Sequence, residues 1–169
     1  MSTRRHADPP RRPPTIFWED FQAGQVREFG AVTLTQEEII DFASRFDPQP
    51  FHLDDAAGRA TPYGGLIASG WHTCAIAMRM MCDEYLLDAA SLGSPGLENL
   101  RWTAPVRPGD TLRMRLTVLA RRVMQSRPEA GLVDTRWELT NQRGEVVLDM
   151  RGWGMFGRRP STGAAAVTG

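Results

Sequence analysis

The feature that most constrains the fold is the run of residues 71–90, where apolar side chains occupy nearly the whole circumference of a helix. A surface helix carries its apolar residues along one stripe, whereas a helix that is apolar all round is typical of a buried position. The apolar residues of this run include Ala75, Ile76, Ala77, Met78, Met80, Met81, Tyr85 and Leu86. The sequence therefore predicts a central helix that the rest of the chain must surround.

The second half of the chain supplies a predicted antiparallel sheet. Residues 111–122 alternate between apolar and polar side chains, which is the period of a half-buried strand. Further strands are expected at residues 26–34, 96–103, 132–140 and 145–156, with a hairpin turn at 141–144. One apolar sheet face covered by one helix is an α+β arrangement. The length of 169 residues suits a single domain, predicted at 16–158, between disordered tails at 1–15 and 159–169.

Composition excludes several classes of partner. Basic and acidic residues number 20 each, so the formal net charge is zero, which argues against nucleic acid. No apolar segment approaches the roughly 18 residues that span a bilayer, and none resembles a secretory signal. Cys74 and Cys82 would lie about 12 Å apart along one helix, too far for a disulfide. We therefore expect a cytoplasmic protein without a membrane or nucleic-acid partner.

The loop from Asp47 to His52 is the first candidate for chemistry. Thr35 and Glu38 have capping-box spacing and predict a helix that ends near Asp47, because Pro48 disfavours helical backbone before it. An imidazole titrates near neutrality, so His52 and Asp47 together are able to move protons and orient a water molecule. Desolvation by neighbours such as Phe46 and Phe51 would raise the pKa of Asp47 toward that of a useful base, which the sequence alone leaves open. The alternative interpretation is an aspartate that forms a turn and a structural histidine.

The glycine-rich segment before the predicted central helix is the second candidate. Backbone N–H groups at a helix N-terminus are unpaired and carry partial positive charge, so they are able to bind a carbonyl oxygen. Gly64 and Gly65 would let a ligand approach closely, and we expect them, with Ser69 and Phe51, to bind substrate. The alternative is that the two glycines only form a tight turn.

Together the segments Asp47-Pro48-Gln49-Pro50-Phe51-His52 and Gly64-Gly65-Leu66-Ile67-Ala68-Ser69-Gly70-Trp71 resemble the MaoC-like, (R)-specific enoyl-CoA hydratase group. The resemblance runs from about Phe17 to Phe156 and implies a single hotdog domain, a long antiparallel sheet wrapped around a central buried helix. Gln49 stands where this group commonly has Asn, and Ser69 stands where many members have His. Both departures leave the acyl substrate open.

The resemblance also implies a mechanism. Asp47 and His52 would orient and deprotonate a water molecule that adds to C3 of a trans-2-enoyl thioester, and then help to deliver a proton to C2. The Gly70 N–H would bind the thioester carbonyl, and dehydration is the reverse reaction. The family uses no metal or redox cofactor, and its members usually form homodimers by joining two sheets. The expected substrate is an acyl-CoA in preference to an acyl-carrier thioester.

Two other functions compete with this interpretation. In a hotdog thioesterase, a carboxylate would activate water against the thioester carbonyl. In a non-catalytic acyl-thioester-binding subunit, Asp47 and His52 would only hold the loop. A metal site at His72 and Cys74 has no supporting ligand spacing, so His72 is expected to be a packed or interface residue.

Overall fold

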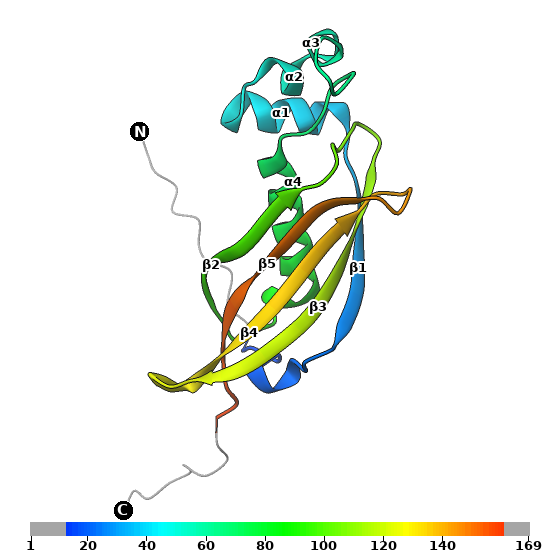
Figure 1. Ribbon diagram of the computed structural model, residues 1–169. Helices are drawn as coiled ribbons and strands as arrows, with labels where there is room; N and C mark the ends of the chain where they lie inside the picture. The colour runs from blue at the N-terminus through cyan, green and yellow to red at the C-terminus, as the bar shows by residue number, and fades with distance from the viewer. Residues whose placement is uncertain (1–12, 161–169) are drawn as a thin grey trace, which may run out of the picture.

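Five antiparallel strands form one curved sheet in the order β1-β3-β4-β5-β2 (Figure 1). The computed structural model describes residues 13–160. The strands are β1 (Val26–Thr33), β2 (Ser91–Trp102), β3 (Thr111–Met124), β4 (Arg127–Thr140) and β5 (Val146–Gly157). The predicted strands and the turn at 141–144 are confirmed, since Asn141 N–H donates to the Glu145 carbonyl and Gly144 has a positive φ of 75°.

The predicted central helix is α4 (Gly70–Met81), which continues through the π-helical segment η2 (Cys82–Leu86) to give 17 residues. It lies across one face of the sheet (Figure 1). Its buried side chains pack against the apolar face of β3 and its neighbours, and the α+β arrangement is confirmed. The buried core residues of the central helix and of β3 are Ala77, Met80, Met81, Tyr85, Leu112, Met114, Leu116 and Val118.

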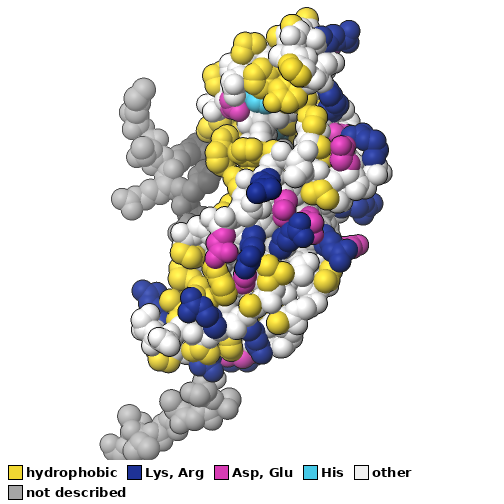
Figure 2. Space-filling view, in the orientation of Figure 1, with side chains coloured by type: hydrophobic (Ala, Val, Ile, Leu, Met, Phe, Trp, Pro, Cys, Tyr) yellow, Lys and Arg dark blue, Asp and Glu magenta, His cyan; other side chains and the backbone are white. Residues whose placement is uncertain are grey.

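The prediction that the central helix is buried on all sides is wrong for the single chain. Trp71, Ala75 and Met78 form an exposed stripe at helical spacing, because the sheet curves around only one side of the helix. Leu97 and Trp102 of the edge strand β2 are exposed as well. Figure 2 shows hydrophobic side chains gathered along the edge of the molecule formed by β2 and the start of α4.

Three short helices gather at the end of the molecule where α4 begins (Figure 1). α1 (Gln36–Phe46) starts at the predicted capping box, in which Thr35 Oγ1 accepts from Glu38 N–H and Glu38 accepts from Thr35 N–H. Asp47 follows directly with φ −152°, since Pro48 prevents continuation of the helix.

The loop predicted after Asp47 is partly helical. α2 (Pro50–Leu53) begins at a proline, whose fixed φ and missing N–H suit the first helical position. α3 (Asp55–Arg59) follows and is capped by Asp54, which accepts from Ala57 N–H at 2.8 Å. This turn-by-turn path reverses the chain and carries it back to the start of α4.

Most of the two predicted tails, residues 1–12 and 161–169, lies outside the described residues. The described ends contact the domain: Thr15 N–H donates to the Asp88 carbonyl at 2.8 Å, and Arg159 pairs with Asp20. Cys74 and Cys82 are both free. Within residues 13–160, no helix combines the length and the apolar character needed to cross a membrane.

Candidate active site

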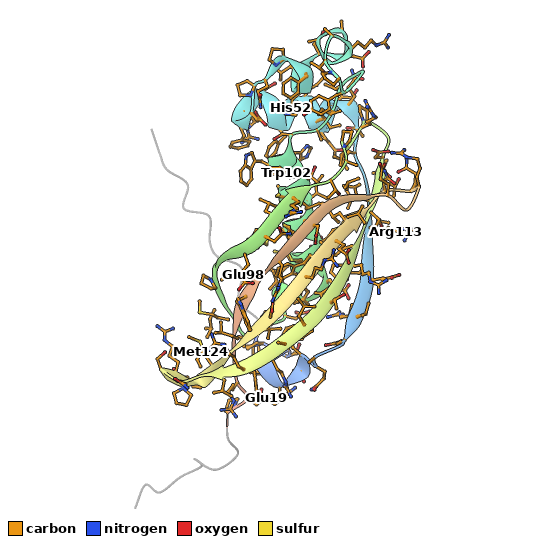
Figure 3. All side chains as sticks on the ribbon, in the orientation of Figure 1. Glu19, His52, Glu98, Trp102, Arg113 and Met124 are labelled. Atoms are coloured by element: carbon orange, nitrogen blue, oxygen red, sulfur yellow. The ribbon has the colours of Figure 1, made fainter. Side chains whose placement is uncertain are left out.

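The fold brings Asp47 and His52 together within the group of short helices α1, α2 and α3. Asp47 follows the end of α1 and His52 lies in α2, so the tight path between the two helices turns both side chains toward each other. His52 Nε2 is 3.4 Å from Asp47 Oδ2, and the two side chains are only 6% and 17% exposed. Figure 3 shows His52 in this helical layer, with Trp102 near the start of α4.

The ring orientation of His52 is set by one backbone contact. Nδ1 lies 2.8 Å from the carbonyl oxygen of Ile67, in the segment that leads into α4. A carbonyl only accepts hydrogen bonds, so Nδ1 carries the proton and neutral His52 presents a lone pair on Nε2. Phe51 packs against the ring in an edge-to-face arrangement, with ring centroids 4.5 Å apart. The basic nitrogen therefore faces the carboxylate.

Each oxygen of the Asp47 carboxylate has its own donor. Ser69 Oγ donates to Oδ2 at 2.6 Å, and Gln49 Nε2 donates to Oδ1 at 2.8 Å. The Ser69 hydrogen bond, followed by the Gln49 bond, lowers the pKa of Asp47 against the opposing effect of burial. The charge of His52 lowers this pKa further only when the imidazole is protonated. Desolvation does act on Asp47, but the hydrogen bonds outweigh it and the pKa falls. Phe46, one of the two neighbours named for desolvation, is itself 64% exposed.

The start of α4 completes the site. Asp47, His52 and Gly70 line one cavity of about 490 Å³, together with Gln49, Phe51, Tyr63, Ile67, Ala68, Trp71, Thr73, Trp102, Thr103, Ala104, Pro105 and Val106. Gly70 is the first residue of the helix, so its N–H has no acceptor within the helix. Trp102 Nε1 donates to the Gly70 carbonyl at 2.9 Å.

The other predicted site residues do not all line the cavity. Phe51 lines the cavity, but Ser69 is completely buried and reaches Asp47 instead. Within the described chain, the cavity wall does not include Gly64 or Gly65. Gly64 has a positive φ of 70°, a conformation that glycine adopts readily in a tight turn.

Two residues of the site were not singled out from the sequence. Gln49 stands out in the sequence only as a departure from the family pattern, and nothing in the sequence singles out Trp102. The Trp102 contact has no sequence signal, because Trp102 is 32 residues from Gly70 and meets it only through the fold. Gln49 is only two residues from Asp47, so its contact is local. His72 lies outside this cavity: it is buried and stacks on Phe42, with ring centroids 4.6 Å apart.

Comparison with known proteins identifies the family and the relatives of this chain. The family described as "MaoC like domain" matches residues 20–141, which is more than half of the chain. A crystal structure of the MaoC-like dehydratase from Rhodospirillum rubrum is 41% identical, with a TM-score of 0.80 over 86% of this chain and 99% of that one. The unliganded R-hydratase PhaJ1 from Pseudomonas aeruginosa is 26% identical, with a TM-score of 0.66 over 85% and 87% of the two chains.

A third relative is 3-hydroxyacyl-thioester dehydratase Z from Mycobacterium tuberculosis. It is 37% identical over 84 residues, which span 48% of this chain and 56% of the relative. The fold is thus the hotdog fold, with the sheet wrapped around a central helix. The chain belongs to the MaoC-like dehydratase family, a family of hydratases and dehydratases.

Proposed function

We propose that the protein hydrates 2-enoyl thioesters and, in the reverse direction, dehydrates 3-hydroxyacyl thioesters. The observation that carries this proposal is a single cavity lined by the Asp47 carboxylate, the basic nitrogen of His52 and the first residue of a helix. Hydration needs a base for water and a donor for the thioester oxygen, and these three groups supply both.

The hydrogen-bond directions divide the work between the two side chains. Neutral His52 accepts at Nε2, and ionised Asp47 only accepts, so both groups suit the two protons of one water molecule. His52 Nε2 removes one proton, while the lowered pKa of Asp47 keeps that carboxylate ionised and a poor proton acceptor. Asp47 orients the water molecule.

The bond changes then balance. The oxygen of the water molecule bonds to C3, the double-bond electrons move toward the thioester carbonyl, and the Gly70 N–H stabilises the charge on that oxygen. The proton held by His52 returns to C2, which completes the addition of one water molecule. Dehydration follows the same steps in reverse.

The named relatives support the reaction class. One solved relative is called an R-hydratase and another relative a 3-hydroxyacyl-thioester dehydratase. We propose a coenzyme A thioester as the substrate in preference to a carrier-bound one. A homodimer is also proposed, because the stripe of Trp71, Ala75 and Met78 and the edge strand β2 expose apolar surface beside the cavity.

A hotdog thioesterase and a non-catalytic acyl-thioester-binding subunit are the competing functions. In a thioesterase, water would attack the thioester carbonyl carbon and release a thiol. In a binding subunit, the contacts of Asp47 and His52 would serve only to hold α2.

One assay separates the three functions. Purified protein is mixed with crotonyl-CoA and longer 2-enoyl-CoAs, and enoyl absorbance and free thiol are followed together. Loss of absorbance without thiol release is the expected result. Thiol release would support the thioesterase, and inactivity across chain lengths would support the binding subunit.

Two variants assign the chemistry to the site. Asp47→Asn and His52→Ala are each expected to reduce hydration at least 100-fold while the thermal unfolding midpoint and the oligomeric state stay close to wild type. Near-normal turnover in both variants would contradict the site assignment.

A further inference from the structure

Ser69 occupies the junction between the catalytic carboxylate and the central helix. It is 0% exposed, and its hydroxyl makes two hydrogen bonds of opposite direction. Ser69 Oγ donates to Asp47 Oδ2 at 2.6 Å and accepts from Trp71 N–H at 3.2 Å. The directions are fixed because a carboxylate has no proton to give and a backbone N–H has no lone pair to offer.

The peptide group that joins Gly70 to Trp71 is held from both sides. Its N–H donates to Ser69 Oγ, and its carbonyl accepts from Trp102 Nε1 at 2.9 Å. The Gly70 N–H belongs to the preceding peptide, between Ser69 and Gly70. The proposed donor to the thioester oxygen is therefore only a few bonds from the serine that binds Asp47.

We propose that Ser69 is a positioning residue, which fixes the Asp47 carboxylate at a set distance from the Gly70 N–H. This inference rests on the proposed hydratase function. Hydration requires water at C3 and charge stabilisation at the carbonyl oxygen of the same substrate, so the groups that serve these two atoms must keep a constant separation. Ser69 connects them through one buried hydroxyl.

Helix capping alone does not account for this arrangement. A capping serine only needs to accept a hydrogen bond, and its proton is free to point toward any acceptor. Here the proton is directed to a side chain 22 residues away in the sequence, at a short distance. That hydrogen bond is also the largest contribution to the lowered pKa of Asp47.

Gln49 is the second donor to the Asp47 carboxylate, and it differs from Ser69 in its exposure to solvent. Its amide donates to Oδ1, but Gln49 is exposed, so water is able to replace this donor. Ser69 is completely buried, so solvent has poorer access to the position of its hydroxyl than to that of the Gln49 amide. The two donors are therefore expected to have unequal effects on catalysis.

The kinetic test compares Ser69→Ala and Ser69→Gly with wild type and with Ser44→Ala. Glycine is tolerated at a helix cap almost as well as serine, so Ser69→Gly removes the donor with little cost to α4. Ser44 lies on the exposed side of α1, where its hydroxyl bonds only to the Ile40 carbonyl, and serves as the control. We expect kcat to fall about 10- to 100-fold in both Ser69 variants with KM unchanged. Wild-type kcat in Ser69→Gly would overturn the proposal.

A second measurement does not depend on turnover. Carbon-13 carboxyl resonances of the aspartates are titrated, and the Asp47 resonance is identified by its loss in Asp47→Asn. The Asp47 titration is expected to move to higher pH in Ser69→Ala and Ser69→Gly, and to stay unchanged in Ser44→Ala. An unchanged Asp47 titration in the Ser69 variants would overturn the role of Ser69. A wild-type protein that hydrates no enoyl thioester would instead contradict the proposed function.

Discussion

The substitution Gly70→Ala tests the start of α4 with a single methyl group. A Cβ at this position would lie 2.4 Å from Cε2 and 2.6 Å from Nε1 of the Trp102 ring, whereas ordinary contacts begin at 3.4 Å. Either the ring or the helix start must therefore move by about 1 Å. The hydrogen bond from Trp102 to the Gly70 carbonyl would be lost or distorted in either case.

A shift of this size has separate effects on catalysis and on stability. Misplacement of a catalytic group by about 1 Å, or loss of one oxyanion donor, reduces turnover about 100-fold. Overpacking costs about 1–3 kcal/mol, offset by about 0.5–1 kcal/mol because alanine is more favourable than glycine in a helix. We thus expect a 100-fold loss of kcat/KM with a fall of only a few degrees in the unfolding midpoint.

The measurement is crotonyl-CoA hydration, with thermal unfolding followed in parallel. Trp102→Ala and the double variant Gly70→Ala/Trp102→Ala complete a double-mutant cycle. If the clash is the cause, Gly70→Ala costs far less activity in the Trp102→Ala background than in wild type. Near-wild-type kcat/KM in Gly70→Ala would refute the role of this helix start. Equal losses in both backgrounds would refute the steric mechanism.

Three further outcomes are expected. Trp102→Phe keeps an aromatic ring but removes the donor to the Gly70 carbonyl, and should lower kcat about 2- to 10-fold, whereas full activity would argue against that contact. Gln49→Ala should lower kcat by a smaller factor than Ser69→Ala, and the reverse order would contradict the assignment of the two donors. Burial lowers the pKa of His72, against the opposing effect of Glu38, so its protonation favours the unfolded chain. Urea unfolding should show stability falling as the pH drops below about 6.5, with a weaker dependence in His72→Phe; equal dependence in both proteins would exclude His72 as its source.

Periodicity and local signals were sufficient to predict most of the fold. The alternation in residues 111–122 and the apolar run after Trp71 depend on neighbours in the chain, and so does the Thr35–Glu38 capping box. These patterns reflect backbone geometry with periods of 2.0 and 3.6 residues, which is a local property. The helical turn at Pro50–Leu53 was missed because four residues are too short for any periodic pattern.

The burial of the central helix illustrates a different limit. Its composition predicts apolar surroundings on every side, and one sheet supplies them on one side only. Composition reports that a surface is apolar, but what covers that surface depends on how far the sheet curves. The exposed stripe of Trp71, Ala75 and Met78 is therefore a property of the tertiary structure.

The sequence by itself determined which residue types were available for chemistry: a carboxylate, an imidazole and a glycine at the start of a buried helix. Only the tertiary structure decided their electrostatics and their partners. Desolvation by apolar neighbours would raise the pKa of Asp47, but the donors Ser69 and Gln49 lower it, and Ser69 comes from a segment 22 residues away. A pKa depends on the directions of hydrogen bonds within a few ångströms, and those directions exist only after distant segments of the chain have packed together.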